Sequence, residues 1–339
     1  MQILALSYSK AMGRIFFLGV NTGYVRDETP TAQHIKFHAD RSGNGLYCTI
    51  VGNVLTPRGH GTNSVCARIS RAPEWKTLAN EIQNSGAIAG IQLSSTWTEY
   101  QGIKEFKNKS PENKLDEYLL VAKRINNNNI KDIFSDLRSA SELSIEAGFK
   151  HIQLHAAHGY LFNLLLDPFF SSNYELALEE FCRWVEYLKA NNIESSIRLS
   201  TKIGMAQIDS NDTRLAELMD TPCDYVDLSQ GLYNIEKRLI YPTLAEILDA
   251  RWETNIDTAK RHPNRNFIAS GKFRSDNARS RILPENINIG ICRDLIANPN
   301  FLENRSDGCQ NKMKCHYFSR NEDSLSCGKW NRVSLSTKT

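Results

Sequence analysis

Residues 148–173 read GFKHIQLHAAHGYLFNLLLDPFFSSN, a stretch that delivers two histidines and one tyrosine to a single short loop. Residues 150–154 predict a strand, and the apolar letters after the loop predict a buried helix. His155, His158 and Tyr160 therefore leave the carboxyl end of a strand together. In a parallel α/β protein ligands bind at that edge, because loops supported by a rigid sheet project polar groups into one pocket.

Two imidazoles and a phenol supply hydrogen-bond donors, acceptors and a transferable proton, a composition that suits an active site. The alternative is that His155 and His158 are core or loop residues whose ring nitrogens the protein itself satisfies. The pattern in the rest of the chain favours the first interpretation.

Short apolar, β-branched runs recur along the chain and alternate with amphipathic stretches. Eight runs predict strands, at residues 15–20, 47–55, 87–93, 151–154, 196–199, 225–228, 267–269 and 287–291. Seven stretches predict helices, at residues 32–40, 73–84, 130–146, 176–191, 215–220, 244–261 and 277–282. Apolar strands joined by crossover helices form a parallel sheet buried on both faces, and eight such units close into a (β/α)8 TIM barrel.

We therefore predict an α/β protein with a single barrel over residues 1–305. Residues 98–129 are polar, with Lys and Asn runs, and predict a long loop. Residues 306–339 fall outside the periodic pattern and predict a cysteine-containing tail packed on or beside the barrel.

The bulk composition narrows the functional class. With 23% charged and 41% hydrophobic residues, the 339-residue chain suits a soluble globular protein. The net charge of +3 comes without a basic stripe, which argues against nucleic-acid binding. No apolar run reaches the ~18 residues needed to span a bilayer, so we expect a cytoplasmic protein. The polar residues of the predicted pocket suggest a small-molecule substrate. Eight scattered cysteines indicate reduced thiols, and the sequence leaves a homo-oligomer open.

Polar residues at other strand ends suggest what this pocket binds. Gly271 and Lys272 follow the seventh strand, and Cys292 and Arg293 follow the eighth, where barrels often hold a phosphate. A glycine lets backbone N–H groups approach an anion, and a guanidinium binds phosphate in bidentate fashion. Alternatively, Gly271 is a turn residue and Arg293 a helix cap.

Two further polar residues interrupt apolar strands. Arg198 lies in the fifth strand and Gln92 in the third. A buried arginine is unfavourable unless it meets an anion or several acceptors, so Arg198 should point into the barrel mouth. Either residue alone could be a satisfied core group, but together they match the polar edge of a flat heterocycle.

The run HAAHGYL at residues 155–161 resembles the Old Yellow Enzyme family of FMN-dependent NAD(P)H:flavin oxidoreductases and ene-reductases. Gly148-Phe149 upstream and Asp167-Pro168 downstream extend the resemblance, which covers nearly the whole chain. It implies FMN as cofactor and NADH or NADPH as reductant. The implied cofactor-binding residues are Gly19, Val20, Asn21, Gly52, Gln92, Arg198, Gly271, Lys272, Cys292 and Arg293.

The resemblance also implies catalytic roles. His155 and His158 would hydrogen-bond the carbonyl of an α,β-unsaturated substrate, and Tyr160 would protonate its α-carbon. Arg198 would stabilise the negative charge of the reduced flavin. The long loop that usually follows the histidine motif is missing, because Asn173 runs directly into a predicted helix.

The tail resembles the cluster-binding segment of larger iron–sulfur members of the family. Its four positions read Cys309, Lys312, Cys315 and Cys327. A lysine cannot replace a thiolate ligand, so we expect neither a 4Fe-4S cluster nor another metal.

Three other functions remain open from the sequence. The flavin scaffold could serve a changed reaction, such as a non-redox isomerisation or a specialised biosynthetic step. A barrel that binds FMN without turnover is a second alternative. A third is a metal-dependent hydrolase that uses His155 and His158 with a carboxylate such as Asp227.

Overall fold

The computed structural model describes residues 13–100, 102, 106, 109–272, 283–312 and 314–330. Eight parallel strands form a closed barrel, because each pairs with the next and the last pairs with the first. In order around the barrel they are β1 (Ile15–Phe17), β4 (Cys48–Leu55), β6 (Ile88–Ser94), β7 (His151–Ala156), β8 (Glu194–Ser200), β9 (Tyr225–Ser229), β10 (Phe267–Ser270) and β11 (Ile287–Ile291). The predicted (β/α)8 barrel is confirmed.

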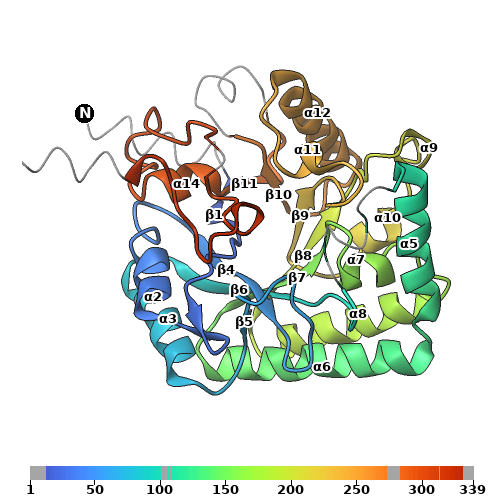
Figure 1. Ribbon diagram of the computed structural model, residues 1–339, viewed down its shortest axis with the longest axis horizontal. Coiled ribbons are helices and arrows are strands. Elements are labelled where there is room, and N and C mark those ends of the chain that lie inside the picture. The colour runs from blue at the N-terminus through green and yellow to red at the C-terminus, as the bar shows by residue number, and fades with distance from the viewer. Residues whose placement is uncertain are drawn as a thin grey trace, which may run out of the picture.

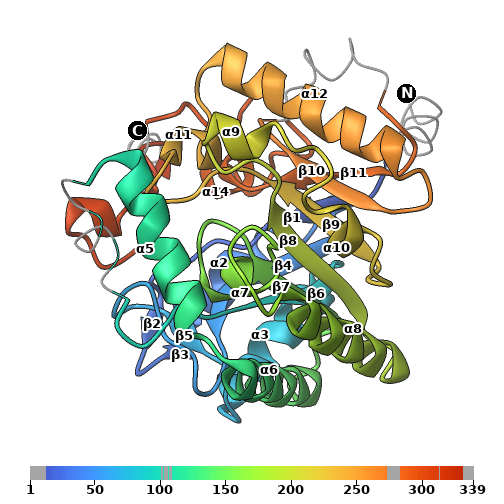
Figure 2. The same cartoon turned by 90° about the vertical axis from the view of Figure 1, so that its right-hand side faces the viewer.

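Helices surround the barrel and connect its strands (Figures 1 and 2). They are α2 (Ala32–Ala39), α3 (Pro73–Asn84), α6 (Asn127–Glu146), α8 (Tyr174–Ala190), α10 (Ala216–Met219), α12 (Ala245–Arg261) and α14 (Arg293–Ala297). Smaller elements decorate the loops: β2 (Val25–Arg26), β3 (Thr29–Pro30), β5 (Ala67–Arg68), α7 (Leu161–Leu165), α9 (Ala206–Asp209), α11 (Lys237–Ile240) and the 3-10 helix η1 (Phe318–Arg320). The helix predicted at residues 277–282 lies outside the described residues.

Local sequence explains where several helices begin. The Thr31 hydroxyl accepts a hydrogen bond from the His34 amide at the start of α2. Asn126 and Asn129 form a reciprocal capping box at the start of α6. Pro73 occupies the first turn of α3, where its missing N–H needs no partner.

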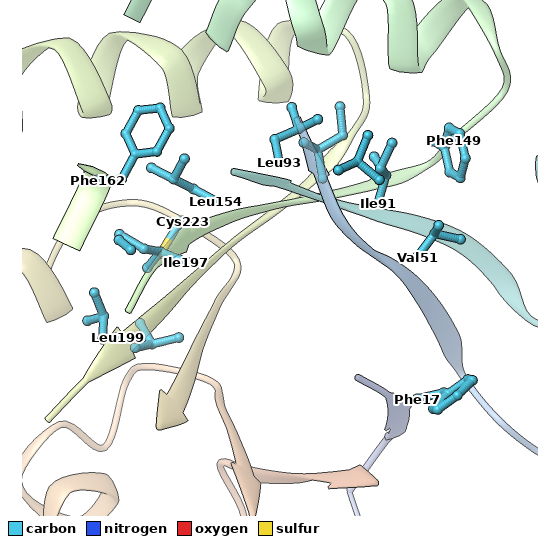
Figure 3. Close-up of a cluster of buried hydrophobic side chains, with 14 of the residues drawn as sticks. Phe17, Val51, Ile91, Leu93, Phe149, Leu154, Phe162, Ile197, Leu199 and Cys223 are labelled. Carbon is cyan, nitrogen blue, oxygen red and sulfur yellow. The ribbon is translucent and has the colours of Figure 1, made fainter. Parts of the chain in front are cut away.

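The barrel strands separate two kinds of side chain. Outward-facing residues of neighbouring strands pack against the helices and form the main apolar core. Figure 3 shows Leu93 and Leu154 of this core pointing from their strands towards the covering helices. Inside the barrel, a small apolar cluster that includes Phe16 and Ile268 fills one side. Polar side chains at alternate positions of β6 to β9 fill the other side, so the groups able to bind a ligand or transfer a proton lie in the barrel interior.

The prediction of a loop over residues 98–129 was wrong. Helix α5 (Pro111–Arg124) occupies half of it, and the Ser110 hydroxyl caps the helix by accepting from the Asn113 amide at 3.2 Å. Its buried side includes Leu115 and Tyr118, which pack in an apolar cluster beside the barrel mouth. The sequence analysis overlooked this helix because Lys and Asn runs on either side of it give the whole region a polar character.

The cysteine-containing tail contacts the barrel. The Leu325 amide donates to the Thr22 carbonyl at 2.8 Å, and the Trp330 indole donates to the Ile296 carbonyl at 3.0 Å. The boundary predicted between residues 305 and 306 stays a prediction. Among the described residues, no helix has both the length and the hydropathy needed to cross a membrane.

Candidate active site

The residues predicted to form the site lie at the carboxyl ends of the barrel strands. Those ends share one mouth because the strands run parallel. Gly19, Val20 and Asn21 follow β1, while Gly52, Gln92, His155 and Arg198 lie within β4, β6, β7 and β8. Gly271 and Lys272 follow β10, and Cys292 and Arg293 follow β11.

The loop after β7 brings His155, His158 and Tyr160 together. The His155 ring centroid lies 5.4 Å from that of His158 and 5.0 Å from that of Tyr160. Positive φ angles of 66° at His158 and 81° at Gly159 turn the chain sharply between them. All three aromatic side chains are buried, so a ligand that reached them would be shielded from water.

The two histidines differ in what their ring nitrogens meet. Nδ1 of His158 donates to the Gly231 carbonyl at 3.1 Å, and Nε2 lies 3.3 Å from the Ser229 hydroxyl. A carbonyl can only accept, so Nδ1 carries the proton and Nε2 accepts from Ser229. The buried Nδ1 of His155 has no hydrogen-bond partner in the part of the chain that the structure describes. His155 is therefore the imidazole that keeps an unsatisfied ring nitrogen.

Burial sets the protonation states of the loop. Together with the nearby Arg198 guanidinium, burial lowers the pKa of His155 to about 3. Burial, followed by Arg198, also holds the pKa of His158 well below its usual value. In contrast, burial raises the pKa of the Tyr160 phenol, and Tyr233 and Tyr100 reinforce the effect. At neutral pH the site therefore holds two uncharged imidazoles and a protonated phenol.

A polar network crosses the barrel interior beneath this loop. The Gln92 amide donates to Gln153 at 2.6 Å, and the Gln153 amide donates to Asp227 at 3.4 Å. Arg198 pairs with Asp227 at 3.1 Å and donates to Ser229 at 3.3 Å. Asp227 is fully buried, so Arg198 compensates its charge.

The sequence argument used Gln92 and Arg198 but did not place Gln153 or Ser229 in the network. The alternation of polar and apolar residues along the two strands could have placed both side chains inside the barrel. Gln153 lies two residues before His155, and Ser229 two residues after Asp227, so each pair shares the inner face of its strand.

Arg251 is a third inward-facing guanidinium that the sequence analysis missed. It is 2% exposed, and its Nε finds no hydrogen-bond partner among the described residues. Burial, followed by the positive charges of Arg198 and Arg293, lowers its pKa to about 9. Nη1 of Arg293 is likewise buried and unpartnered within the described chain. This concentration of positive charge is suited to an anion.

Two glycines allow close packing around Gln92. A Cβ on Gly52 would lie 2.7 Å from the Gln92 Cβ, and one on Gly19 would lie 3.1 Å from the Gln92 side-chain oxygen. At Gly271 a Cβ would approach Arg251 and the Trp252 indole to 3.2 Å. The missing side chains therefore let Gln92 and Arg251 take up their positions at the mouth.

For the remaining predicted residues, the structure shows contacts with other parts of the protein or a backbone conformation. Val20 bridges to Gly52, while the Asn21 side chain accepts from the Tyr317 hydroxyl at 2.9 Å and thereby contacts the tail. Lys272 has a φ of 45° directly after Gly271. Burial raises the pKa of the Cys292 thiol to about 12, so this side chain remains uncharged.

The arrangement is unlike that of a metal-dependent hydrolase. Asp227 pairs with Arg198, and Nε2 of His158 faces Ser229. Among the described residues, no group of three or more His, Cys, Asp or Glu side chains could hold a metal ion. Cys309, Cys315 and Cys327 are free thiols that share a surface pocket with Lys312.

The chain is similar in sequence to known flavin enzymes. A model of the NADH:flavin oxidoreductase / NADH oxidase family matches residues 19–311. An NADPH dehydrogenase of Clostridium acetobutylicum is 25% identical over 304 residues, which cover 83% of this chain and 85% of the relative. A putative 12-oxophytodienoate reductase 3 of Oryza sativa subsp. japonica is 24% identical over 272 residues, covering 73% and 69% of the two chains.

Solved structures support the fold. A 2-naphthoyl-CoA reductase superposes with a TM-score of 0.73 at 14% identity, covering 94% of this chain and 55% of that longer one. The Old Yellow Enzyme of Pichia sp. AKU4542 superposes with a TM-score of 0.59 at 15% identity, covering 86% and 83%. At these identities the likeness shows a shared barrel architecture.

Proposed function

Because the chain belongs to the NADH:flavin oxidoreductase / NADH oxidase family, we propose that it reduces the activated C=C bond of an α,β-unsaturated carbonyl compound or a similar small molecule. The resemblance to the Old Yellow Enzyme family is confirmed, since the family model covers most of the chain. The protein is an NAD(P)H-dependent flavin oxidoreductase, and its cofactor is FMN. When bound, FMN supplies the hydride chemistry that links NADH or NADPH to the alkene.

The residues at the barrel mouth fit this cofactor. FMN combines a flat ring bearing amide-like groups with an anionic phosphate. The free side-chain oxygen of Gln92 and the Arg198 guanidinium would meet the polar edge of the ring between Gly19 and Gly52. Arg293 and Arg251 would hold the phosphate beside Gly271, because both carry buried nitrogens without a partner among the described residues.

We assign the binding of the substrate carbonyl mainly to His155. Its buried Nδ1 is unpartnered among the described residues, and its ring lies 5.0 Å from that of Tyr160. A neutral imidazole that donates to the substrate carbonyl stabilises the negative charge that develops on this oxygen. His158 could donate a second hydrogen bond to the carbonyl only if its proton moved from Nδ1 to Nε2, which would cost the bond to the Gly231 carbonyl. Tyr160 then delivers a proton to the α-carbon, and water exclusion strengthens each of these interactions.

A spectroscopic titration tests the proposal. Purified protein reconstituted with FMN should show flavin absorbance, bleach on anaerobic addition of NADPH or NADH, and recover its colour on addition of 2-cyclohexenone. His155→Ala should weaken enone binding roughly 10-fold to 100-fold, as expected for a lost buried hydrogen bond, while the bleaching step persists. A protein that binds no FMN would refute the cofactor site, and unchanged enone binding in the variant would refute the role of His155.

A flavin enzyme with a changed, non-redox reaction is the second candidate. It is favoured by the short connection after Asn173, because α8 begins at Tyr174 and leaves no room for a longer loop over the mouth. Product formation from a candidate substrate in the presence of FMN but without NAD(P)H would support this alternative.

A further inference from the structure

Two tyrosines from distant parts of the chain extend the reach of Tyr160. Tyr233 follows β9, and Tyr241 follows α11. The rings of Tyr160 and Tyr233 stack with centroids 5.7 Å apart and an interplanar angle of 28°. The Tyr233 and Tyr241 hydroxyls are hydrogen-bonded to each other, with ring centroids 6.0 Å apart. The three phenols thus form a row that leads away from the histidine loop.

Loss of the Tyr160 proton poses an electrostatic problem. The side chain is only 6% exposed, and burial raises its pKa. Its neighbours His155 and His158 are uncharged at neutral pH, because burial lowers the pKa of each. A tyrosinate would therefore be poorly stabilised at this position, and a rapid return of a proton would remove it.

Tyr233 is placed to return that proton. A phenol hydroxyl can donate one hydrogen bond while it accepts another, so a row of phenols can pass protons along it. Burial raises the pKa of Tyr233, whereas hydrogen bonding to Tyr241 and to Tyr160 opposes this rise. The same hydroxyl therefore interacts with both ends of the row.

We propose that Tyr233 and Tyr241 form a hydroxyl relay that reprotonates Tyr160 as it protonates the substrate, an inference that rests on the proposed function. The Tyr160 O–H bond breaks as the α C–H bond forms on the enolate. The Tyr233 O–H bond then breaks as that of Tyr160 reforms, and the Tyr241 O–H bond breaks as that of Tyr233 reforms. The enolate's negative charge thus moves to the Tyr241 oxygen, which takes a proton from water. No electrons beyond those of NAD(P)H are needed.

The surroundings of Tyr241 suit the outer end of such a relay. Its ring meets that of His316 in the tail edge to face, with centroids 4.1 Å apart. Burial, together with the positive charges of Lys237 and Arg293, lowers the pKa of His316 to about 4. Burial and the neighbouring Tyr233 hydroxyl raise the pKa of Tyr241, so a negative charge on it would be short-lived. The Tyr241 residue is partly exposed where the loop after α11 meets the tail, which gives water a place to return the proton.

Half-reactions of the holoenzyme test the relay. Tyr233→Phe and Tyr241→Phe each remove one hydroxyl and keep the ring. Flavin reduction by NADPH should be unchanged, whereas reoxidation by 2-cyclohexenone should slow at least tenfold, within the range of proton-transfer contributions. The reoxidation rate of the wild-type enzyme should depend on the deuterium fraction of the solvent along a curve, because several protons move together. In Tyr241→Phe the dependence should become linear.

The matched control is Tyr225→Phe, because the Tyr225 hydroxyl is hydrogen-bonded to Arg14 at the opposite end of the barrel. This variant should keep both the reoxidation rate and the curved dependence. If both relay variants keep the wild-type rate and curvature, the relay is wrong. If Tyr233→Phe releases FMN, the rate and curvature of Tyr241→Phe decide, because it is Tyr233 whose ring packs against those of His158 and Tyr160.

Tyr160→Phe separates the two levels of the proposal. If it slows reoxidation but the relay variants do not, Tyr160 is the proton donor and is reprotonated by another route. If reoxidation in Tyr160→Phe equals that of the wild-type enzyme, the assignment of Tyr160 fails and the relay fails with it.

Discussion

His151 and His155 lie at opposite ends of strand β7, and both face the barrel interior, yet the protein treats them differently. His151 is fully buried and uses both ring nitrogens, with Glu194 3.2 Å from Nδ1 and Ser196 2.7 Å from Nε2. His155 is 6% exposed, and its Nδ1 lacks a partner among the described residues. The difference between these two histidines is therefore one of hydrogen-bonding partners: the ring at the amino end is satisfied by the protein, and the ring at the carboxyl end keeps an unpartnered nitrogen within the described chain.

The arginines repeat the contrast. Arg14 at the amino end pairs with Glu194, hydrogen-bonds the Tyr225 hydroxyl and lies 4.1 Å from the Tyr47 ring centroid. At the carboxyl end, Arg251 donates to the Leu239 carbonyl but keeps an unpartnered Nε within the described chain. Arg14 thus has a carboxylate and a phenol as partners, whereas Arg251 carries a positive charge that an anion would complete.

The largest expected effect is on FMN affinity, when a positive charge at the carboxyl end of the barrel is removed. Arg251→Met should weaken FMN binding by roughly 2–3 kcal/mol, about a 30-fold to 150-fold rise in Kd, because a charged contact with the phosphate is lost. The unfolding free energy of the apoprotein should stay constant or rise, since a buried charge is removed. Isothermal titration with FMN and urea unfolding measure the two quantities.

Arg71→Met is the matched control for that change, because Arg71 is exposed and pairs with Glu146 on the outer surface. It should alter neither quantity. An unchanged FMN affinity in Arg251→Met would show that Arg251 does not contact the cofactor.

At the amino end of the barrel we expect a smaller effect, on folding stability rather than on FMN affinity. Glu194→Ala removes the carboxylate that accepts hydrogen bonds from His151 and Tyr47. It should lower the unfolding free energy by about 1–2 kcal/mol, because it leaves the buried His151 Nδ1 unsatisfied, and it should leave the FMN Kd unchanged. Urea unfolding of the apoprotein gives the first value. A loss of FMN affinity without a loss of stability would contradict the assigned division between the two ends.

The smallest effect concerns pH. Burial lowers the pKa of His155 to about 3, below the value of an unfolded histidine near 6.5. The unfolded chain therefore binds a proton that the folded protein does not, and the stability contribution present above pH 6.5 is lost as the pH falls. Between pH 6 and 5, His155→Asn should reduce the slope of apoprotein stability against pH by roughly 1 kcal/mol per unit.

Glu194 acts in a different pH window. Burial opposes its charge, but hydrogen bonds from His151 and Tyr47 hold its pKa below the usual value of 4.5. Its contribution is complete above that value and is lost as the pH falls through the lower folded-state pKa. Equal slopes in His155→Asn and the wild-type protein would show that His155 is not kept neutral by burial.

The sequence located the eight barrel strands because each buried strand is a short apolar run between amphipathic helices. Strand β11 matches the predicted residues 287–291, and α3 matches residues 73–84. Helix α5 was missed although its buried residues Leu115, Tyr118 and Ala122 have helical spacing, because the Lys and Asn runs on either side of it made residues 98–129 look like a polar loop. The order of strands around the closed barrel followed from the number of β/α units.

By itself, the sequence determined the barrel, the histidine loop and the edge at which His155, Gln92 and Arg198 meet, because periodicity and strand direction are local properties. Only the tertiary structure decided which polar groups remain available. Both ring nitrogens of His158 have hydrogen-bond partners because Gly231 and Ser229, far along the chain, approach its ring. Nδ1 of His155 has none among the described residues. The burial of Arg251 and the row of tyrosines likewise depend on loops that meet only when the barrel closes.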